Sequence, residues 1–331
     1  KVNYNDVFYQ VRMWDTIIYN ELLKYDIVIP MRDMNAKEHK EELVGAYVKD
    51  PNVGFHDWVV SFDLNSLYPH LIMQYNISPE TILKKKKDIT IDKLINKEID
   101  TSDGHCLAAN GTMYKSDKQG MLPRIIQKEY NARTIFKKKM LEAEQMYANT
   151  KDKKYEKLAR KYYIVQHSKK ISLNSAYGAI GNKYFRYYDH RQAEAITMSG
   201  QLNIKWIEKK LNEYFNKLYN TNDDYIIASD TDSVYINMAP LVKMTGATDK
   251  VKIVKALDKF CKEKVEPYIA TVYKELADYM NVYQQKMEMA REVIADRDIW
   301  TAKKRYILNV HNSEGVQYPE PKLKIMGIEA V

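Results

Sequence analysis

Hydrophobic residues recur with a helical period in some parts of this chain and form short apolar runs in others. The helical period predicts helices over residues 11–23, 123–150, 153–177, 193–218 and 249–279. The short runs predict strands at residues 27–30, 45–51, 58–62, 225–228, 234–236, 299–300, 306–310 and 323–326. Helices and strands in mixed order, without an internal repeat, indicate an α+β fold.

The two central helices are predicted to form an antiparallel hairpin, because only a short polar turn at residues 149–152 separates them. A single long coiled coil is excluded by the lack of a sustained apolar heptad. Gly178 and Gly181 are expected to end the second helix. Ser66 is expected to cap a helix that runs to Tyr75, with Pro69 in its first turn. The polar stretch from Lys84 to Gly120 predicts a loop or a small subdomain.

Composition narrows the class of protein. The chain has 331 residues, 45% of them hydrophobic, a net charge of +8 and a pI near 9.0, which suggests an anionic partner. Tyrosine is abundant, with 27 residues against 7 phenylalanines, as suits nucleic-acid binding; an AT-rich coding sequence explains the bias equally well. Cys106 and Cys261 are too far apart in the sequence to indicate a disulfide framework or a zinc site. Without a signal-like start or an apolar span, we expect a soluble, cytoplasmic protein with no membrane contact.

Three aspartates lie at predicted strand ends. Asp230 and Asp232 flank a turn between two apolar runs, and Asp63 ends the run at residues 58–62. Carboxylates in this arrangement could hold the two divalent cations of a phosphoryl- or nucleotidyl-transfer site, and Mg²⁺ prefers such oxygen ligands. Aspartate is also a common turn residue, so an ordinary turn remains the alternative.

Cations and polar groups share faces of the two hairpin helices. Lys170, Asn174 and Tyr177 lie at positions i, i+4 and i+7 of one helix, and Arg133 and Lys137 lie at i and i+4 of the other. In an antiparallel hairpin the cations could converge on an anion such as a triphosphate. The alternative is a solvated charged face.

Two further features concern aromatic and basic residues. Tyr68 follows the first acidic strand by five residues, where its ring could press on a sugar or simply pack in the core. A basic cluster at residues 303–306 follows Trp300 and leads into a predicted strand. Such a cluster suits a nucleic-acid backbone, although lysines also protect exposed strand edges.

Taken together, these segments resemble a known family. Residues 63–69 (DLNSLYP), 170–178 (KISLNSAYG) and 230–233 (DTDS) resemble, in order, the three polymerase motifs of family B DNA polymerases. Residues 303–306 (KKRY) resemble the later basic motif of that family, and residues 120–137 resemble its first fingers helix. Residues 75–81 (YNISPET) are similar to the T4-like bacteriophage branch. The resemblance covers nearly the whole chain.

The resemblance implies a polymerase palm with an antiparallel sheet and an inserted antiparallel helical-hairpin fingers subdomain. Residues 1–57 would lead into the palm, 58–121 and 182–331 would form its two parts, and 122–181 would form the fingers. Exonuclease and thumb domains, usual in the family, are not found. The chain would therefore be a fragment or one subunit of a split polymerase, with other chains or missing segments supplying these domains.

The resemblance also implies roles for individual residues. Two Mg²⁺ ions, with Mn²⁺ as a substitute, would be held by Asp63, Asp232, the Leu64 carbonyl and, in support, Asp230. The incoming dNTP would be bound by Arg133, Lys137, Lys170, Ser66, Leu67, Asn174 and Tyr177, with Lys170 also assisting the departure of pyrophosphate. Tyr68 would be the steric gate against a ribose 2′-hydroxyl. Primer–template DNA would be contacted by Thr231, Lys303, Lys304, Arg305 and Tyr306.

The implied activity is DNA-templated addition of dNTPs to a primer 3′-hydroxyl, in the cytoplasm of an infected bacterial cell if the chain is phage-encoded, with a sliding clamp as a candidate partner. One departure is Ala228-Ser229, where the family usually has Tyr-Gly before the paired aspartates. A polymerase-derived, non-catalytic DNA-binding subunit is the main alternative. An RNA polymerase or reverse transcriptase is disfavoured by Tyr68 and by the order of the motifs.

Overall fold

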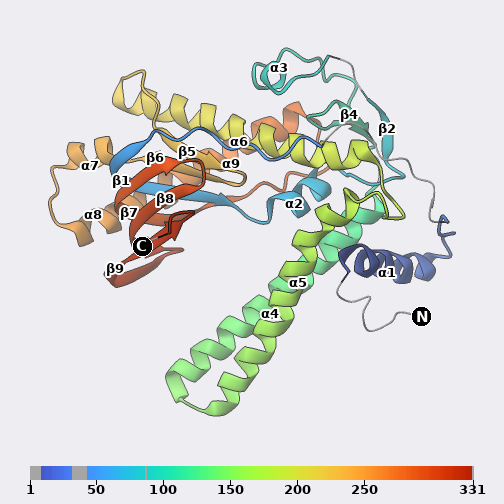
Figure 1. The fold of residues 1–331 in the computed structure, drawn as a ribbon, viewed down its shortest axis with the longest axis horizontal. Coiled ribbons are helices and arrows are strands. Elements are labelled where there is room, and N and C mark those ends of the chain that lie inside the picture. Colours follow the sequence, from blue (N-terminus) through green and yellow to red (C-terminus); the bar gives the residue numbers. More distant parts are fainter. Residues whose placement is uncertain (1–8, 32–42, 86–87, 330–331) are drawn as a thin grey trace.

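The computed structural model describes residues 9–31, 43–85 and 88–329 (Figure 1). Its main element is a six-stranded antiparallel sheet with strand order β5-β6-β1-β7-β8-β9. The strands are β1 (Gly54–Leu64), β5 (Ile226–Asp230), β6 (Ser233–Asn237), β7 (Met289–Ala302), β8 (Arg305–Ser313) and β9 (Val316–Met326). The predicted α+β class is confirmed.

Alternation along β1 distributes its side chains between two hydrophobic clusters. Val60 and Phe62 belong to the larger cluster, together with buried residues of the helices, whereas Val59 belongs to a smaller cluster with Trp300 and Tyr306. The helices that contact the sheet are α6 (His190–Tyr219), α7 (Ala239–Thr245), α8 (Lys250–Phe260) and α9 (Glu266–Tyr279). The sheet thus has one thickly covered face and one with a thinner apolar layer.

Helices α4 (Met121–Thr150) and α5 (Lys153–Ile180) form the predicted antiparallel hairpin, which projects from the body (Figure 1). Lys169 Nζ lies 2.7 Å from Glu129 Oε2, and the rings of Phe136 and Tyr162 are 6.1 Å apart, which fixes the register of the two helices. A residue of α4 and a residue of α5 therefore lie at the same distance along the hairpin when their residue numbers add up to about 298. The hairpin is confirmed.

Helix α1 (Gln10–Leu22) supports the base of the hairpin. The indole Nε1 of the buried Trp14 donates hydrogen bonds to the Ser172 carbonyl at 3.2 Å and to Ser175 Oγ at 3.1 Å. Residues 82–114 form a small subdomain with the sheet β2 (Ile82–Lys85), β4 (Thr112–Tyr114) and β3 (Cys106–Leu107) and the helix α3 (Ile91–Ile95). Within the described ranges, no helix is both long and apolar enough to cross a membrane.

Two predicted strands at the start of the chain are wrong. Residues 27–30 form no strand: Val28 is 90% exposed, and the Pro30 carbonyl accepts its hydrogen bond from the Arg186 side chain, not from a neighbouring strand. Residues 45–51 make a single bridge between Val48 and Asp230, although Lys49 N also donates to the Ser229 carbonyl at 3.0 Å. This segment therefore lines the edge of β5 without forming a regular strand.

Three helix boundaries also differ from the prediction. Ser66 precedes α2 (Leu67–Gln74) in a left-handed conformation with φ of 48°, and its side chain makes no capping hydrogen bond. Gly178 lies inside α5, which ends at Ile180, so only Gly181 marks its end. The helix expected over residues 249–279 is present, but its middle part, Cys261–Val265, is a π-helical segment that joins α8 to α9.

The last three strands are much longer than the apolar runs that predicted them. β7 already begins at Met289, ten residues before the predicted run at 299–300. β9 is largely exposed, so polar residues dominate it and its apolar pattern is weak. The helix α7 was not predicted. The ends of the three strands are set by hydrogen bonding to neighbouring strands, which a single sequence does not reveal.

Candidate active site

The end of β1 and the turn between β5 and β6 bring two of the predicted carboxylates together. Asp63 pairs with Ser233 of the neighbouring strand, and the Leu64 amide donates to the Asp232 carbonyl at 2.8 Å. Thr231 has a left-handed φ of 59°, which allows the tight turn between Asp230 and Asp232. The β1–β6 register therefore positions Asp63 and Asp232 on adjacent chain segments.

Both carboxylates lie in an environment that disfavours their ionised form. Burial raises the pKa of Asp63 to about 7, and the negative charges of Asp232 and Glu292 add to this shift. Burial also raises the pKa of Asp232 to about 6, with contributions from Asp230 and Glu292. Among the described residues, no Lys, Arg or His forms an ion pair with either carboxylate.

The third aspartate has a different environment. Asp230 Oδ1 lies 2.8 Å from Lys304 Nζ and accepts a hydrogen bond from Thr231 Oγ1 at 3.0 Å. Accordingly, no group of three or more His, Cys, Asp or Glu side chains arranged to hold a metal is found in the part of the chain that the structure describes. The chemistry of the pair Asp63 and Asp232 nevertheless fits divalent cations, because two partly buried carboxylates without a counter-ion need positive charge.

Glu292 is a member of this site that the sequence did not reveal. Its Oε2 accepts a hydrogen bond from Ser61 Oγ at 3.2 Å, and its Oε1 lies 2.8 Å from Lys324 Nζ. Glu292 lies near the start of β7, in the part of that strand that the apolar pattern did not predict. Glu292 could have been assigned to the site only from the pairing of β7 with β1, which the sequence pattern does not reveal.

The hairpin contacts the same region through Arg133. Its Nη1 donates to Ser66 Oγ at 3.2 Å, and its buried Nε has no hydrogen-bond partner among the residues that the structure describes. Lys137 and Lys170 are exposed. From the hairpin register, Lys170 lies level with residue 128, so the three cations are staggered over about 14 Å of the hairpin's length. The structure thus places them along a line and not at one point.

Two tyrosines lie at the junction of α2 and α5. The rings of Tyr68 and Tyr177 are 4.7 Å apart, and burial raises the pKa of Tyr68 to about 12. Leu67 is buried beside them in the larger cluster, whereas Asn174 is exposed one turn before Tyr177. The Tyr68 ring is thus packed against another aromatic ring and still half-buried.

The basic cluster forms the turn between β7 and β8. Lys303 Nζ lies 3.1 Å from Asp50, Lys304 pairs with Asp230, and Arg305 is exposed. Tyr306 is different, because its side chain is buried: its hydroxyl lies 2.9 Å from that of Tyr235, and its ring stacks on Trp300 at 4.2 Å. Tyr306 supports the turn from below, while the three cations form its surface.

Ser229, at the departure from the usual family pattern, is buried beside Glu208 of α6. Burial raises the pKa of Glu208, although the nearby Ser229 hydroxyl and the positive charge of Lys49 act in the opposite direction. Tyr47 also donates to Glu208 at 3.4 Å and accepts from Thr231 N through its carbonyl. Ser229 therefore lies behind the turn, close to the polar groups of Glu208 and Tyr47.

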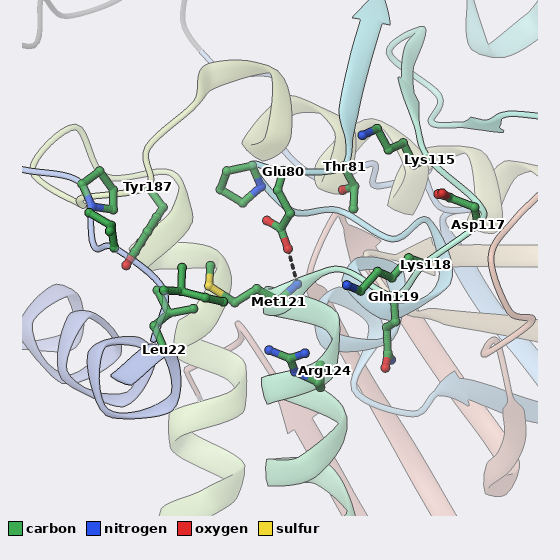
Figure 2. A pocket seen from close by; sticks show the side chains of 14 residues that line it. Leu22, Glu80, Thr81, Lys115, Asp117, Lys118, Gln119, Met121, Arg124 and Tyr187 are labelled. Atoms are coloured by element: carbon green, nitrogen blue, oxygen red, sulfur yellow. Dashed lines mark hydrogen bonds between the residues drawn. The ribbon is translucent and has the colours of Figure 1, made fainter. Parts of the chain in front are cut away.

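A cavity of about 550 Å³ lies apart from these residues, at the first turn of α4 (Figure 2). Leu22, Met121 and Tyr187 form apolar walls, and Arg124 and Lys118 extend toward it. Glu80 accepts a hydrogen bond from the Met121 amide at the start of the helix (Figure 2). None of the three aspartates lines this cavity, so it is not the candidate active site.

Comparison with known proteins shows the family of this chain. The model of the family described as DNA polymerase family B matches residues 9–331. The chain is 36% identical over 99% of its length to the DNA-directed DNA polymerase of Escherichia phage RB69, and 37% identical over 99% to that of Enterobacteria phage T4. It is also 27% identical over 87% of its length to a DNA polymerase beta of African swine fever virus. The chain belongs to DNA polymerase family B.

The match covers only part of these relatives. The chain spans 42% of the length of each of the two phage polymerases and 25% of the viral one.

Proposed function

We propose that this chain is the nucleotidyl-transfer core of a DNA-templated DNA polymerase, made of the palm (residues 58–121 and 182–331) and the fingers (122–181). Residues 1–57 lead into the palm. The observation that carries the proposal is the pair Asp63 and Asp232, held together by the β1–β6 register and without an ion-pair partner among the described residues.

Asp63, Asp232 and the Leu64 carbonyl would hold two Mg²⁺ ions, with Asp230 in support and Mn²⁺ as a substitute. When bound, these ions stabilise the attacking and leaving oxygens of the transfer. The raised pKa values of Asp63 and Asp232 support this role, because an ionised carboxylate pair gains from a cation between its members.

The chain's own side chains would bind and orient the nucleotide. Arg133, Lys137 and Lys170 grip the triphosphate, and Lys170 offsets charge on the leaving pyrophosphate. Ser66 and Leu67 would lie beside the triphosphate. The Ser66 hydroxyl already accepts a hydrogen bond from Arg133. Asn174 and Tyr177 line the nascent base pair.

Tyr68 would act as the steric gate. Its ring packs against Tyr177 and is held in place by burial, so it has little freedom to yield to a ribose 2′-hydroxyl. This rigidity favours a DNA polymerase over an RNA polymerase.

Thr231, Lys303, Lys304 and Arg305 would contact primer–template DNA near the primer end, with Tyr306 supporting their turn. The chain spans less than half of its phage relatives, and we propose that other chains or further segments supply exonuclease and thumb domains. A sliding clamp is a further candidate partner, and the cytoplasm of an infected bacterium is the proposed location.

A polymerase-derived, non-catalytic DNA-binding subunit is the second candidate. It is favoured by one observation: Asp230 is paired with Lys304, and no three-carboxylate cluster is formed among the described residues.

Primer extension by the purified chain with Mg²⁺ and dNTPs tests the proposal, alongside Asp232→Ala and the control Asp57→Ala, which alters an exposed aspartate of β1. Extension by the wild type and the control, abolished in Asp232→Ala, supports a self-sufficient core. No extension with dNTP binding retained indicates a subunit that needs its partners. Loss of both extension and dNTP binding favours the non-catalytic subunit.

A further inference from the structure

The positive charge of this protein is segregated in the hairpin. Residues 121–180 contain 14 Lys and Arg against 5 Asp and Glu, a net charge of +9, while the whole chain has +8. The other 271 residues therefore carry a net charge of −1. A general bias toward lysine would raise the charge everywhere, so composition alone does not explain this distribution.

Five cations form an exposed surface at the start of α5, here named the α5 cationic face: Lys153, Lys154, Lys157, Arg160 and Lys161. Within the described ranges, none of the five makes an ion pair with a carboxylate, although Glu156 lies in the same turn. The face is therefore charged and uncompensated.

These cations act against the stability of their own helix. Lys153 and Lys154 occupy the first turn of α5, where the helix dipole disfavours positive charge by about 0.3–1 kcal/mol each. Lys153 and Lys157, like Lys157 and Lys161, lie at i and i+4, where like charges repel by a few tenths of a kcal/mol. Asp152 at the N-cap and Glu156 in the first turn offset part of this cost, but five cations still face these two acids. Places where a sequence breaks a local rule are often functional sites.

The α5 cationic face extends beyond the proposed triphosphate cations. The hairpin register places Lys161 level with Lys137, and Lys157 and Lys153 about 6 and about 12 Å further from the body. The hairpin projects freely there (Figure 1). One exposed aromatic residue, Tyr163, follows the face by two positions and stacks on His167 at 5.3 Å.

We propose that the α5 cationic face binds the phosphate backbone of the unpaired template strand ahead of the active site. This inference rests on the proposed function, which requires a single-stranded template to enter. Repeated flexible point charges without a shaped pocket suit sequence-independent contact with a polyanion, and an exposed aromatic ring beside them suits single-stranded nucleic acid.

The test uses the triple variant Lys153→Gln, Lys154→Gln, Lys157→Gln, none of which belongs to the proposed active site. The matched control replaces three exposed lysines of α8 and the π-helical segment, Lys252, Lys255 and Lys262, by Gln. Binding is measured without dNTPs, between about 50 and about 200 mM salt, on primer–templates with overhangs of about 20 and about 2 nucleotides.

For the long overhang, the triple variant is expected to reduce the slope of log affinity against log salt by about 2, at about 0.7 per lost single-strand contact. The control and the short overhang should show no change. The melting temperature of the triple variant should stay equal or rise, because repulsion is relieved. If the triple variant is unstable, Lys157→Gln alone should reduce the slope by about 0.7.

Equal slopes for the wild type and the triple variant on the long overhang would overturn the inference, as would an equal loss in the control. The outcome is separable from the proposed function. A chain that extends no primer but loses overhang-dependent binding in the triple variant supports the inference and contradicts the proposed activity. Extension with unchanged overhang binding gives the reverse result.

Discussion

At the scale of single residues, the main feature is a pair of carboxylates in an unfavourable environment. Asp63 and Asp232 are held close by strand pairing, partly buried and without an ion-pair partner among the described residues, and both pKa values are raised. Their ionised forms therefore destabilise the folded chain. A bound divalent cation would reverse this effect, so stability should report on metal binding.

The first prediction concerns Asp63→Asn. A raised pKa means that the folded state binds more protons than the unfolded one between about pH 4 and about pH 7, so the stability of the wild type falls as pH rises through this range. Without metal, Asp63→Asn should therefore melt at a higher temperature than the wild type at about pH 8, and the difference should shrink toward pH 4.

Calorimetry with and without Mg²⁺ checks this prediction. Added Mg²⁺ should raise the melting temperature of the wild type at about pH 8, less so at about pH 6, and should have little effect on Asp63→Asn. Asp57→Asn, on the same strand, serves as the control. A wild-type melting temperature that rises steadily from pH 4 to 8 while that of Asp63→Asn does not would contradict the raised pKa.

The second prediction concerns Tyr68→Val. Removing the ring opens space beside Tyr177 for a 2′-hydroxyl, so discrimination between dNTP and rNTP should fall by about 10- to 200-fold. Single-nucleotide incorporation, in the presence of any partner chains that activity needs, measures this ratio. Tyr130→Val, which alters a part-buried tyrosine of α4, is the matched control. Unchanged selectivity in Tyr68→Val would rule out the gate.

At the scale of elements, the hairpin depends on its base. Trp14 of α1 is 2% exposed and donates to both Ser172 and Ser175 of α5, so one side chain joins two elements that are about 160 residues apart. Hydrophobic periodicity predicted α1 and both helices of the hairpin, α4 and α5, since each carries a continuous amphipathic pattern. It did not predict that α1 would pack against α5, because this contact depends on tertiary structure.

The third prediction follows from this packing. Trp14→Ala should lower the free energy of unfolding by about 3–5 kcal/mol, through loss of the buried ring and of the hydrogen bond that its single N–H shares between Ser172 and Ser175. Trp14→Phe should cost less, because it retains most of the apolar area. Tyr19→Ala, on the exposed side of the same helix, should change stability by about 0.5 kcal/mol or less. Denaturant titration measures all three, and equal losses for Trp14→Ala and Tyr19→Ala would refute the role of Trp14.

At the scale of the whole molecule, the protein has a packed body and a projecting arm. The sheet and its helices share the large buried cluster, whereas the outer part of the hairpin, as far as the described residues show, is stabilised mainly by contacts between α4 and α5 (Figure 1). The charge follows the same division, with +9 in the hairpin and −1 elsewhere. We therefore expect the hairpin to be less stable than the body, and it carries the more positive charge.

The fourth prediction is that backbone amides in residues 138–160 exchange with solvent much faster than those of β1. Local opening there breaks few buried contacts, so its free energy is well below that of global unfolding. Hydrogen exchange followed by mass spectrometry tests this, with the central residues of α6 as a protected helical control. Protection of residues 138–160 equal to that of β1 would contradict this prediction.

The sequence by itself determined the long helices, the turn of Asp230 to Asp232 and the family motifs, because each is encoded within a few neighbouring residues. Tertiary structure alone decided the rest. It extended β7 and β9 through pairing, placed Ser66 against Arg133 instead of at a helix cap, buried Tyr306, and brought Glu292 beside the aspartates. These outcomes depend on contacts between distant segments, whose energies no local pattern contains.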